Sequence, residues 1–247
     1  MEYFGRSTWQ LLESPCLENS HKEPVLLDIS RCNATQFTCS DSSSCIDLEL
    51  KCDGRMHCKD NSDELMCSRI LEYIGKSPPP KQGGLRSTIT LDVRVPSIID
   101  IDESNELMRI QALVYFEWYD QRLSLLNLNH DSKLNVLSES EVSKIWTPSF
   151  LLNNTLGKDT LAINNNTVVK ITRKGQPSVL AAHYIDNSLV FSGAENPLHG
   201  STFIVKDFLC SFSLGLYPFD TQTCTMDFTV PPSVTSYLVI DENSYAR

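Results

Sequence analysis

The cysteines are the residues whose type and spacing point most directly to chemistry. The chain of 247 residues has nine, and eight of them form one group of six and one of two: Cys32, Cys39, Cys45, Cys52, Cys58 and Cys67, then Cys210 and Cys224. Even numbers of grouped cysteines with turn-rich spacers are typical of disulfides formed in an oxidising compartment. Cys16 has no partner in either group. Either its mate lies in sequence outside this chain, or it is a free thiol in a flexible tail.

Three N-x-Ser/Thr triplets also suit an extracellular protein, because they are acceptor sites for N-glycosylation: Asn33, Asn153 and Asn165. Met1 is not followed by a basic segment and an apolar stretch, so we expect no signal peptide within this chain. The longest apolar run is Ala112 to Phe116, whereas a helix that crosses a bilayer takes about 20 residues. We therefore expect this chain to be an incomplete extracellular part of a longer protein.

The residue types do not support catalysis or nucleic-acid binding. The chain has 31 Asp and Glu against 21 Lys and Arg, a formal charge of −10, and no clustered basic run of the kind that phosphate backbones require. The sequence has no glycine-rich phosphate loop. None of the five histidines has metal-ligand spacing or a neighbouring nucleophile motif: His21, His57, His130, His183 and His199. We expect a protein that is not an enzyme and has no nucleic-acid partner.

Residues 32–67 must fold as a cross-linked module, because this segment has six cysteines and few large apolar side chains. Residues 1–31 show no clear periodicity and stay unassigned. Residues 68–85 are expected to form a linker that begins with one short helix from Ile70 to Ile74. The proline-rich and then glycine-rich run at 77–84 is typical of a stiff spacer that ends in a flexible joint.

From Arg86 onward, the apolar residues recur with the period of two that is typical of strands. The four apolar residues from Ile89 to Val95 alternate with polar ones, which places one face of a strand on a core. A second strand is expected from Met108 to Trp118. Further strands are expected at runs separated by Gly, Asn and Pro turns: Thr167 to Thr172, Val179 to Ile185, Ser188 to Ser192, Thr202 to Leu209 and Phe212 to Leu216. Many short strands of this kind predict a β-sandwich.

The six-cysteine segment resembles the LDL-receptor class A repeat. Its cysteines are separated by six, five, six, five and eight residues, and Phe37 lies two residues before the second of them. The acidic run Asp60 to Glu64 follows the fifth. Spacing alone leaves 15 pairings open for six cysteines. The resemblance implies three disulfides: Cys32 to Cys45, Cys39 to Cys58 and Cys52 to Cys67.

By the same resemblance, the module would hold one calcium ion, a hard cation that takes six to eight oxygen ligands. The implied ligands are three carboxylates and two backbone carbonyls: Asp53, Asp63 and Glu64, with Leu50 and Arg55. His57 stands where a further Asp is usual, and its imidazole brings no formal negative charge, so we expect weakened calcium affinity. Leu50 also replaces the aromatic residue that such repeats use to capture basic partners. The module is therefore either a docking site or a disulfide-held spacer.

Cys210 and Cys224 enclose thirteen residues. A disulfide across this span would reduce the conformational entropy of the unfolded chain and so stabilise the fold by roughly 3 kcal/mol. The enclosed residues resemble the signature loop of the pentameric Cys-loop ligand-gated ion channels: Phe212, Leu214, Tyr217, Pro218 and Asp220. Trp118 to Leu123 and Ile145 to Pro148 resemble two other landmarks of this family. Ala194 to Leu198 is similar to divergent invertebrate members, some of which have class A repeats. The resemblance covers residues 86–247.

This second resemblance implies a mainly β fold, the family's curled immunoglobulin-like β-sandwich, incomplete here at its C-terminus. Tyr217, Pro218 and Phe219 are large apolar residues at a turn, where water normally selects polar ones, so we expect them to pack on a surface outside this chain. In the family, this loop transmits ligand-induced movement to the gate of the pore. Asp220 would then pair with a basic residue at that boundary.

The family binds its ligand between adjacent subunits, in a box of aromatic residues that often surrounds a cationic amine. Three positions of that box lack rings here: Leu113, Asn153 and Pro231. This favours a small-molecule ligand other than an amine, a different chemistry of binding, or a subunit that contributes structure without binding. A glycan on Asn153 would obstruct the pocket.

The combined prediction is the extracellular ligand-binding region of a pentameric ligand-gated ion channel, coupled through the disulfide loop to a pore in the cell membrane. The sequence is compatible with a homo-pentamer and with a hetero-pentamer. The alternative is a secreted soluble binding or adhesion protein with the same sandwich and no pore. The two differ downstream of this chain, where a channel needs four apolar stretches of about 20 residues. A third hypothesis is a receptor ectodomain in which the acidic module binds basic proteins.

Overall fold

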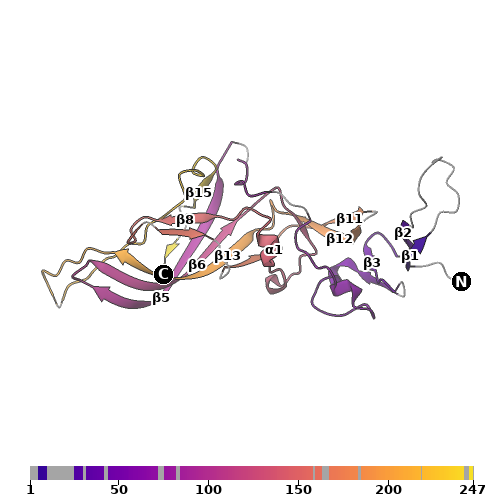
Figure 1. The fold of residues 1–247 in the computed structure, drawn as a ribbon, viewed down its shortest axis with the longest axis horizontal. Coiled ribbons are helices and arrows are strands. Elements are labelled where there is room, and N and C mark those ends of the chain that lie inside the picture. Colours follow the sequence, from indigo (N-terminus) through magenta and orange to yellow (C-terminus); the bar gives the residue numbers. More distant parts are fainter. Residues whose placement is uncertain are drawn as a thin grey trace.

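The computed structural model describes residues 5–9, 25–29, 32–41, 44–71, 75–81, 84–157, 159–162, 167–182, 185–217, 219–241 and 245–246. These residues form a mainly β structure, as predicted. The disulfide-rich module lies at one end of the molecule and the loop between Cys210 and Cys224 at the other, with the sandwich between them (Figure 1). Cys16, Asn165 and Pro218 lie outside the described residues.

The largest sheet is built on three long antiparallel strands: β5 (Ser87–Asp102), β6 (Leu107–Trp118) and β13 (Leu198–Leu209). Its order is β10-β13-β6-β5-β15, with β10 (Val168–Ile171) antiparallel at one edge. At the other edge, β15 (Leu238–Ile240) and β16 (Tyr245–Ala246) both pair with β5 in parallel. Along β6, the even-numbered residues from 110 to 118 are buried and the odd-numbered ones are half-buried. This is the alternation that the sequence predicts for a strand with one face on the core.

Two three-stranded sheets complete the sandwich. One has the order β14-β8-β9, formed by Phe228–Thr229, Ser149–Leu152 and Asp159–Ala162, and the other has the order β11-β12-β7, formed by Ser178–Ala182, Ile185–Ser192 and Ser124–Leu126. The ring of Phe150 on β8 meets Phe116 of the large sheet edge to face, with 5.5 Å between ring centroids. Phe116 also stacks on Trp118 at 5.7 Å. These aromatic contacts join the sheets around one core.

The module has little regular structure and is held by disulfides. It contains β3 (Gln36–Thr38), β4 (Cys45–Asp47) and two 3₁₀ turns, η1 (Leu48–Leu50) and η2 (Ser62–Glu64). The bonded pairs are Cys32 with Cys45, Cys39 with Cys58 and Cys52 with Cys67, which are the pairs that the class A resemblance implies. N-terminal to the module, β1 (Gly5–Trp9) pairs with β2 (Val25–Ile29) in a segment that the sequence leaves unassigned.

Two short helical elements lie between β7 and β8: the 3₁₀ turn η3 (Ser132–Leu134) and the one-turn helix α1 (Glu139–Val142). Ser138 caps α1, because its side chain accepts from the N–H of Glu141 while the Glu141 carboxylate accepts from the N–H of Ser138. This reciprocal capping box explains why so short a helix begins at a defined residue.

Two expectations about local structure are wrong. Phe212 to Leu216 forms no strand, because these residues belong to the disulfide loop, where no neighbouring strand offers backbone partners. Ile70 does not begin a helix either, since it makes a β-bridge with Leu125 of β7, and residues 72–74 of the expected helix lie outside the described residues. Among the described residues, no helix has the length and apolarity needed to cross a membrane.

Candidate functional site

The disulfide loop begins where β13 ends and is fixed at its base. Cys210 and Cys224 are bonded, with 5.2 Å between their Cα atoms. The N–H of Cys210 donates to the carbonyl of Glu106 in the β5–β6 turn at 2.9 Å. The Gln222 side chain spans the loop, donating to the carbonyl of Ser213 and accepting from the N–H of Ser213, each at 2.9 Å. The base of the loop is therefore tied to the end of the large sheet.

The tip of this loop presents large apolar side chains to solvent. Leu216 is 75% exposed, Tyr217 71% and Phe219 91%. The N–H of Phe219 donates to the carbonyl of Leu216 at 2.8 Å, so these side chains sit on a hydrogen-bonded turn. Asp220 is half-buried, and its carboxylate accepts a hydrogen bond from the Gln222 side chain. An exposed apolar cluster on a fixed loop is suited to packing against a partner surface.

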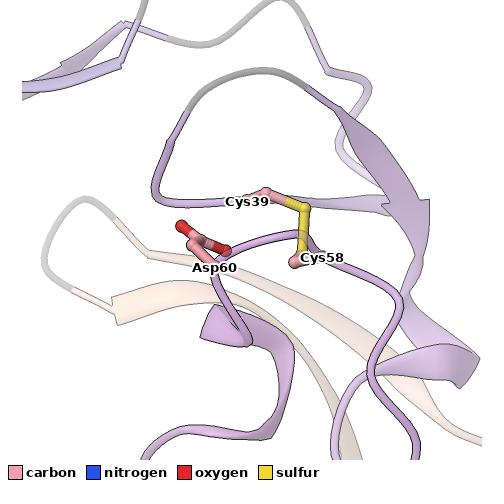
Figure 2. A group of neighbouring side chains, drawn as sticks. All are labelled: Cys39, Cys58 and Asp60. Carbon is pink, nitrogen blue, oxygen red and sulfur yellow. A yellow bond between two sulfur atoms is a disulfide. The ribbon is translucent and has the colours of Figure 1, made fainter.

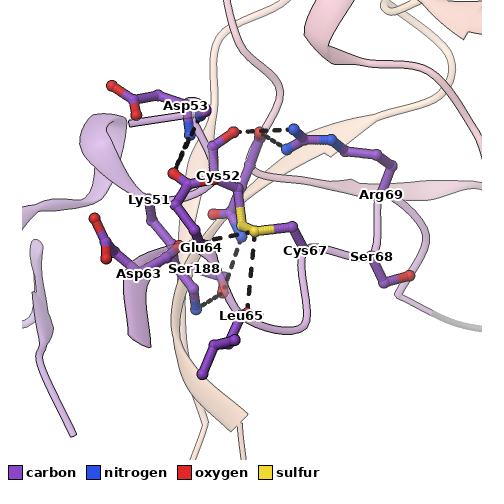
Figure 3. Close-up of a disulfide and its surroundings, with 12 residues drawn as sticks. Lys51, Cys52, Asp53, Asp63, Glu64, Leu65, Cys67, Ser68, Arg69 and Ser188 are labelled. Carbon is purple, nitrogen blue, oxygen red and sulfur yellow. Dashed lines mark hydrogen bonds between the residues drawn. A yellow bond between two sulfur atoms is a disulfide. The ribbon is translucent and has the colours of Figure 1, made fainter. Parts of the chain in front are cut away.

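The acidic residues of the module converge on one turn. Glu64 Oε1 accepts from the N–H groups of Asp53 and Gly54, at 2.9 and 3.1 Å. Asp63 Oδ2 accepts from the N–H of His57 at 2.6 Å, and His57 Nε2 lies 3.1 Å from Asp53 Oδ2. Figure 3 shows the three acidic residues beside the disulfide that joins Cys52 and Cys67. The carboxylates thus surround the turn that runs from residue 53 to residue 57.

The charge and burial of this turn fit a cation. Asp63 is fully buried, and its Oδ1 has no hydrogen-bond partner, an arrangement that is costly for a carboxylate. The pKa of Glu64 is raised, first by burial and further by the negative charges of Asp53 and Asp63. A bound calcium ion would satisfy Asp63 and remove that repulsion. The backbone carbonyls implied as further ligands, those of Leu50 and Arg55, lie just before and within the same turn.

Cys39, Cys58 and Asp60 form the one group of three ligand-type side chains within 4.8 Å of one another in the described residues (Figure 2). The two sulfur atoms are bonded to each other, so neither is a thiolate that could bind a metal ion. Asp60 Oδ1 accepts from the hydroxyl of Ser62 at 2.7 Å, and its Oδ2 accepts from the N–H of Asp41 at 2.7 Å. This cluster is a disulfide with a turn-capping carboxylate and not a metal site.

Arg69 joins the acidic turn of the module to the sandwich. The residue is 6% exposed, and its guanidinium donates to the carbonyls of Cys52 and Leu134, each at 2.9 Å, and to that of Asn127. In Figure 3, the guanidinium of Arg69 points toward Cys52. Burial lowers the pKa of Arg69 and the charge of Glu141 opposes this effect, but an arginine remains protonated in proteins. One buried cation therefore holds backbone from both parts of the chain.

Glu141 fixes the segment that follows the last cysteine of the module. Its Oε1 accepts from the N–H of Arg69 at 2.5 Å and from the hydroxyl of Ser68 at 2.9 Å, while its Oε2 accepts from the N–H and the hydroxyl of Ser138, each at 2.8 Å. Burial raises the pKa of Glu141, but these hydrogen bonds outweigh it and hold the pKa below the ordinary value of 4.5. The α1 cap thus also binds the chain between module and sandwich.

Two further pairs connect the module to β12 and to the chain after β10. Lys51 is 8% exposed, and its Nζ donates to the hydroxyl of Ser188 at 3.0 Å and lies 4.6 Å from the centroid of the Phe37 ring. Arg173 donates to both carboxylate oxygens of Glu49, at 2.6 and 2.7 Å, and this lowers the pKa of Glu49. The module is thus docked on the sandwich of the same chain by side chains from both parts.

The segment expected to be a stiff spacer also contacts the sandwich. Arg122 donates to the carbonyl of Ser77 at 2.9 Å and to its hydroxyl at 3.1 Å, and its other bonds go to the carboxylate of Asp120. Pro79 is buried. The side chains that fix this segment lie more than forty residues downstream, and a local composition pattern cannot show them.

The three implied ligand-pocket positions lie on two different sheets. Asn153 follows β8, and its Nδ2 donates to Asp227 Oδ2 and Thr229 Oγ1, each at 3.1 Å. Pro231 lies two residues beyond Thr229, so these two positions share the β8–β14 end of the sandwich. Leu113 lies on β6, opposite Arg94 and Phe203 in the large sheet. Leu113 therefore lies on a different sheet from the other two positions.

Two of the three sequons lie in the described residues. Asn33 is exposed, at the start of the module. Asn153 is exposed, but its Nδ2 already makes two hydrogen bonds, and Thr155 of the same triplet is buried with its hydroxyl bonded to the carbonyl of Leu152. A glycan on Asn153 would have to replace one of these contacts, so Asn33 is the more accessible acceptor.

The residues of the docking interface are absent from the sequence-based candidates. One signal was available for Glu141, because the spacing Ser138-x-x-Glu141 is that of a capping box. Arg69 and Lys51 had no such signal, since their acceptors are backbone carbonyls and a serine hydroxyl far along the chain.

Two family models match the chain. The model described as the neurotransmitter-gated ion-channel ligand binding domain matches residues 62–188, just over half of the chain. The model described as the low-density lipoprotein receptor domain class A matches residues 30–67. The first match begins within the module, ahead of the interface formed by Arg69, and ends before the disulfide loop.

Similarity to known proteins extends over two thirds of the chain. The betaine receptor acr-23 of Caenorhabditis elegans is 27% identical over 164 residues, which are 66% of this chain and 27% of that protein. The acetylcholine receptor subunit beta of Rattus norvegicus is 27% identical over 171 residues, which are 67% of this chain and 28% of that protein. The chain thus spans about a quarter of the length of these relatives. Both are receptors and not enzymes, which agrees at the family level with the expectation of a non-enzyme.

Proposed function

The chain belongs to the family of neurotransmitter-gated ion-channel ligand-binding domains, and from this we propose that it is the extracellular ligand-binding region of one subunit of a pentameric ligand-gated ion channel in the cell membrane. The family is the one that the sequence resemblance indicates. The proposal extends to the parts of the protein outside this chain: a pore domain, a small-molecule ligand and a homo- or hetero-pentamer.

The observation that supports this proposal most directly is the tip of the disulfide loop. Three large apolar side chains, at 216, 217 and 219, are exposed at the end of the sandwich opposite the module, on a loop whose base is tied to β13 and to the β5–β6 turn. Exposure of such side chains is unfavourable unless a partner surface covers them. The proposed cover is the extracellular face of the pore domain, against which the loop would transmit movement.

We propose a ligand site between adjacent subunits, because Leu113 lies on a different sheet from Asn153 and Pro231. The two named relatives are receptors for betaine and acetylcholine, both of which contain a quaternary ammonium group. Aromatic faces recognise such groups, and these three positions have none. The proposed ligand is therefore a small molecule that hydrogen bonds and apolar contacts can hold without an aromatic box.

The proposed domain division is a class A module at 32–67, a connecting segment at 68–85 and the ligand-binding sandwich at 86–247. We also propose that the module binds one calcium ion through Asp53, Asp63 and Glu64, with His57 weakening the site. The unpartnered Asp63 Oδ1 and the raised pKa of Glu64 support this proposal. The acceptor for N-glycosylation that we favour is Asn33, because the side-chain nitrogen of Asn153 already donates two hydrogen bonds.

Expression of the full-length protein in insect cells tests the channel proposal. A channel subunit is expected in the membrane fraction, and its detergent-solubilised form is expected to have the mass of five subunits. Recovery from the medium as a monomer would overturn the proposal and favour a secreted binding protein without a pore.

The role of the loop tip is tested in the same full-length protein by recording currents evoked by a panel of small neurotransmitters that includes betaine and acetylcholine. Phe219→Ser is expected to abolish the evoked current while surface labelling stays unchanged. Thr221→Ala is the control, since Thr221 is an exposed polar residue of the same loop. Normal currents from the Phe219→Ser variant would show that the tip does not couple the sandwich to the pore.

A further inference from the structure

The turn between Cys52 and Cys58 places an imidazole beside a carboxylate. His57 Nε2 lies 3.1 Å from Asp53 Oδ2. The side chains of His57 and Asp53 are 28% and 14% exposed, so the pair is partly open to solvent. An imidazole nitrogen and a carboxylate oxygen are ligands that zinc and related divalent transition metals accept together. The pair is therefore a candidate chelate for a cation of this class.

Backbone hydrogen bonds hold the two side chains in place. Asp53 Oδ1 accepts from the N–H of Arg55 at 2.8 Å, while Asp53 Oδ2 faces His57. The N–H of His57 donates to Asp63 Oδ2 at 2.6 Å, so the negative charge of Asp63 lies next to His57. The cysteines at both ends of the turn are in disulfides. A pair that is fixed before binding loses little conformational entropy when an ion arrives.

The charge around this pair favours a cation. Asp63 is fully buried, and its Oδ1 has no hydrogen-bond partner. Within the described parts of the chain, no lysine or arginine forms an ion pair with Asp53, Asp63 or Glu64. In Figure 3, the carboxylates of Asp53 and Asp63 lie on the side of the turn opposite the guanidinium of Arg69. A cation at the pair would reduce the free-energy cost of these carboxylates.

Calcium and zinc make different demands on the turn. Calcium takes six to eight oxygen ligands, and the imidazole at position 57 supplies none. Zinc takes four ligands at about 2.0–2.1 Å and readily accepts nitrogen among them. Two ligands of a tetrahedral zinc ion are then about 3.3 Å apart, close to the 3.1 Å between His57 Nε2 and Asp53 Oδ2. The residue that weakens a calcium site thus completes half of a zinc site.

The other half of such a site is not preformed. Among the described residues, no third ligand-type side chain lies within 4.8 Å of both atoms of the pair. Water, or a carboxylate that moves when the ion binds, would supply the remaining ligands. Asp63 and Glu64 are the neighbouring acids, because Asp63 accepts from the N–H of His57 and Glu64 accepts from the N–H of Asp53.

We propose that the acidic turn of the module binds zinc, or another divalent transition metal that accepts nitrogen, in preference to calcium, with His57 Nε2 and Asp53 Oδ2 as its first two ligands. This inference rests on the proposal above that the turn is a metal site, and it concerns which metal the turn prefers. Calcium binds the same turn more weakly. His57 is then a ligand that selects the metal, and not only the loss of an acid.

Titration calorimetry of the full chain with zinc chloride and with calcium chloride tests the proposal. Zinc is expected to bind at least about tenfold more tightly than calcium. His57→Asn should weaken zinc binding by about tenfold or more and should not weaken calcium binding, because only zinc uses the nitrogen. Asp53→Asn should weaken the binding of both metals. His130→Asn is the matched control, since it makes the same change at an exposed histidine of the sandwich and should leave zinc binding unchanged.

The unsubstituted chain provides a second measurement if a variant fails to fold. Zinc should shift the ring proton resonances of His57 in the NMR spectrum and leave those of His130 in place. Zinc binding that is unchanged in His57→Asn, or calcium binding as tight as zinc binding in the unsubstituted chain, would overturn the preference for zinc and leave the calcium proposal standing. Absence of binding of either metal at millimolar concentration would overturn both proposals.

Discussion

Replacing Arg69 by Met tests whether the module is docked on the sandwich or merely tethered to it. The substitution keeps most of the length and apolar contact of the side chain but removes the charge and all three of its hydrogen bonds, to Cys52, Asn127 and Leu134. Each carbonyl then loses a charged donor in a place where water has little access, because Arg69 is 6% exposed. The buried carboxylate of Glu141 also loses a nearby positive charge.

The expected loss follows from these contacts. A hydrogen bond to a charged group contributes about 1.5–3 kcal/mol, and the three bonds share one guanidinium, so their values do not add. Breaking a buried charged network by removing one partner costs about 3–5 kcal/mol, and we expect the free energy of unfolding to fall by that amount. For a chain of this size, this is a fall in melting temperature of about 6–20 °C.

Thermal unfolding of the chain with its disulfides intact, followed by circular dichroism, measures this effect. Lys59→Met is the matched control, because Lys59 is an exposed cation of the same module. Arg69→Lys should give an intermediate result, since an ammonium cannot reach three carbonyls in the geometry of the guanidinium fork. A melting temperature for Arg69→Met equal to that of the control would refute the docking argument.

Three further outcomes are expected. Calcium at 100 times its dissociation constant should raise the free energy of unfolding by about 2.7 kcal/mol, and Asp63→Asn should abolish this effect. In calorimetric titrations with calcium, His57→Asp should strengthen calcium binding roughly tenfold. The pKa of Glu141 is lowered in the folded state, so its stabilising contribution is complete above about pH 4.5 and is lost as pH falls through the folded value. The melting temperature of the unsubstituted chain should therefore decrease when the pH is lowered below 4.5, and the decrease should be smaller in Glu141→Gln. Phe219→Ser should change the free energy of unfolding by less than about 0.5 kcal/mol because the side chain is 91% exposed, while Phe208→Ala, in the core, should cost about 3–5 kcal/mol; denaturant titrations distinguish the two.

The long strands could be predicted from sequence because their signal is local. β6 has twelve residues, its burial alternates from residue 110 to residue 118, and its expected start differs from the observed one by a single residue. The same rule failed for Phe212 to Leu216, whose alternation lies in a loop that has no strand beside it. Alternation shows which side chains could share a face, but a strand also needs backbone partners, and these depend on the rest of the fold.

The sites could be predicted only where a motif fixes them. Cysteine spacing and the acidic run locate the module and its acidic turn, and the residues around Cys210 and Cys224 locate the disulfide loop. The docking interface and the neighbours of each strand follow instead from register and long-range contact. Glu117 becomes a neighbour of His199 only because β6 and β13 pair as they do, 82 positions apart in the sequence. No pattern within either strand contains that information.

The acidic turn and the docking interface use the same piece of backbone. The carbonyl of Cys52 accepts a hydrogen bond from Arg69. The N–H groups of the next two residues, Asp53 and Gly54, donate to the carboxylate of Glu64. Gly54 has a positive φ of 82° and faces the side chain of Leu134 on the sandwich. A cation bound by these carboxylates would change the conformation of this turn. A shift of the sandwich would change it too, because the turn contacts the sandwich. Coupling between two such equilibria is reciprocal: if docking strengthens calcium binding by some factor, calcium strengthens docking by the same factor. If the proposed calcium ion binds this turn, we expect the position of the module on the sandwich to depend on calcium, since the acidic turn rests on the sandwich through Arg69 and Leu134.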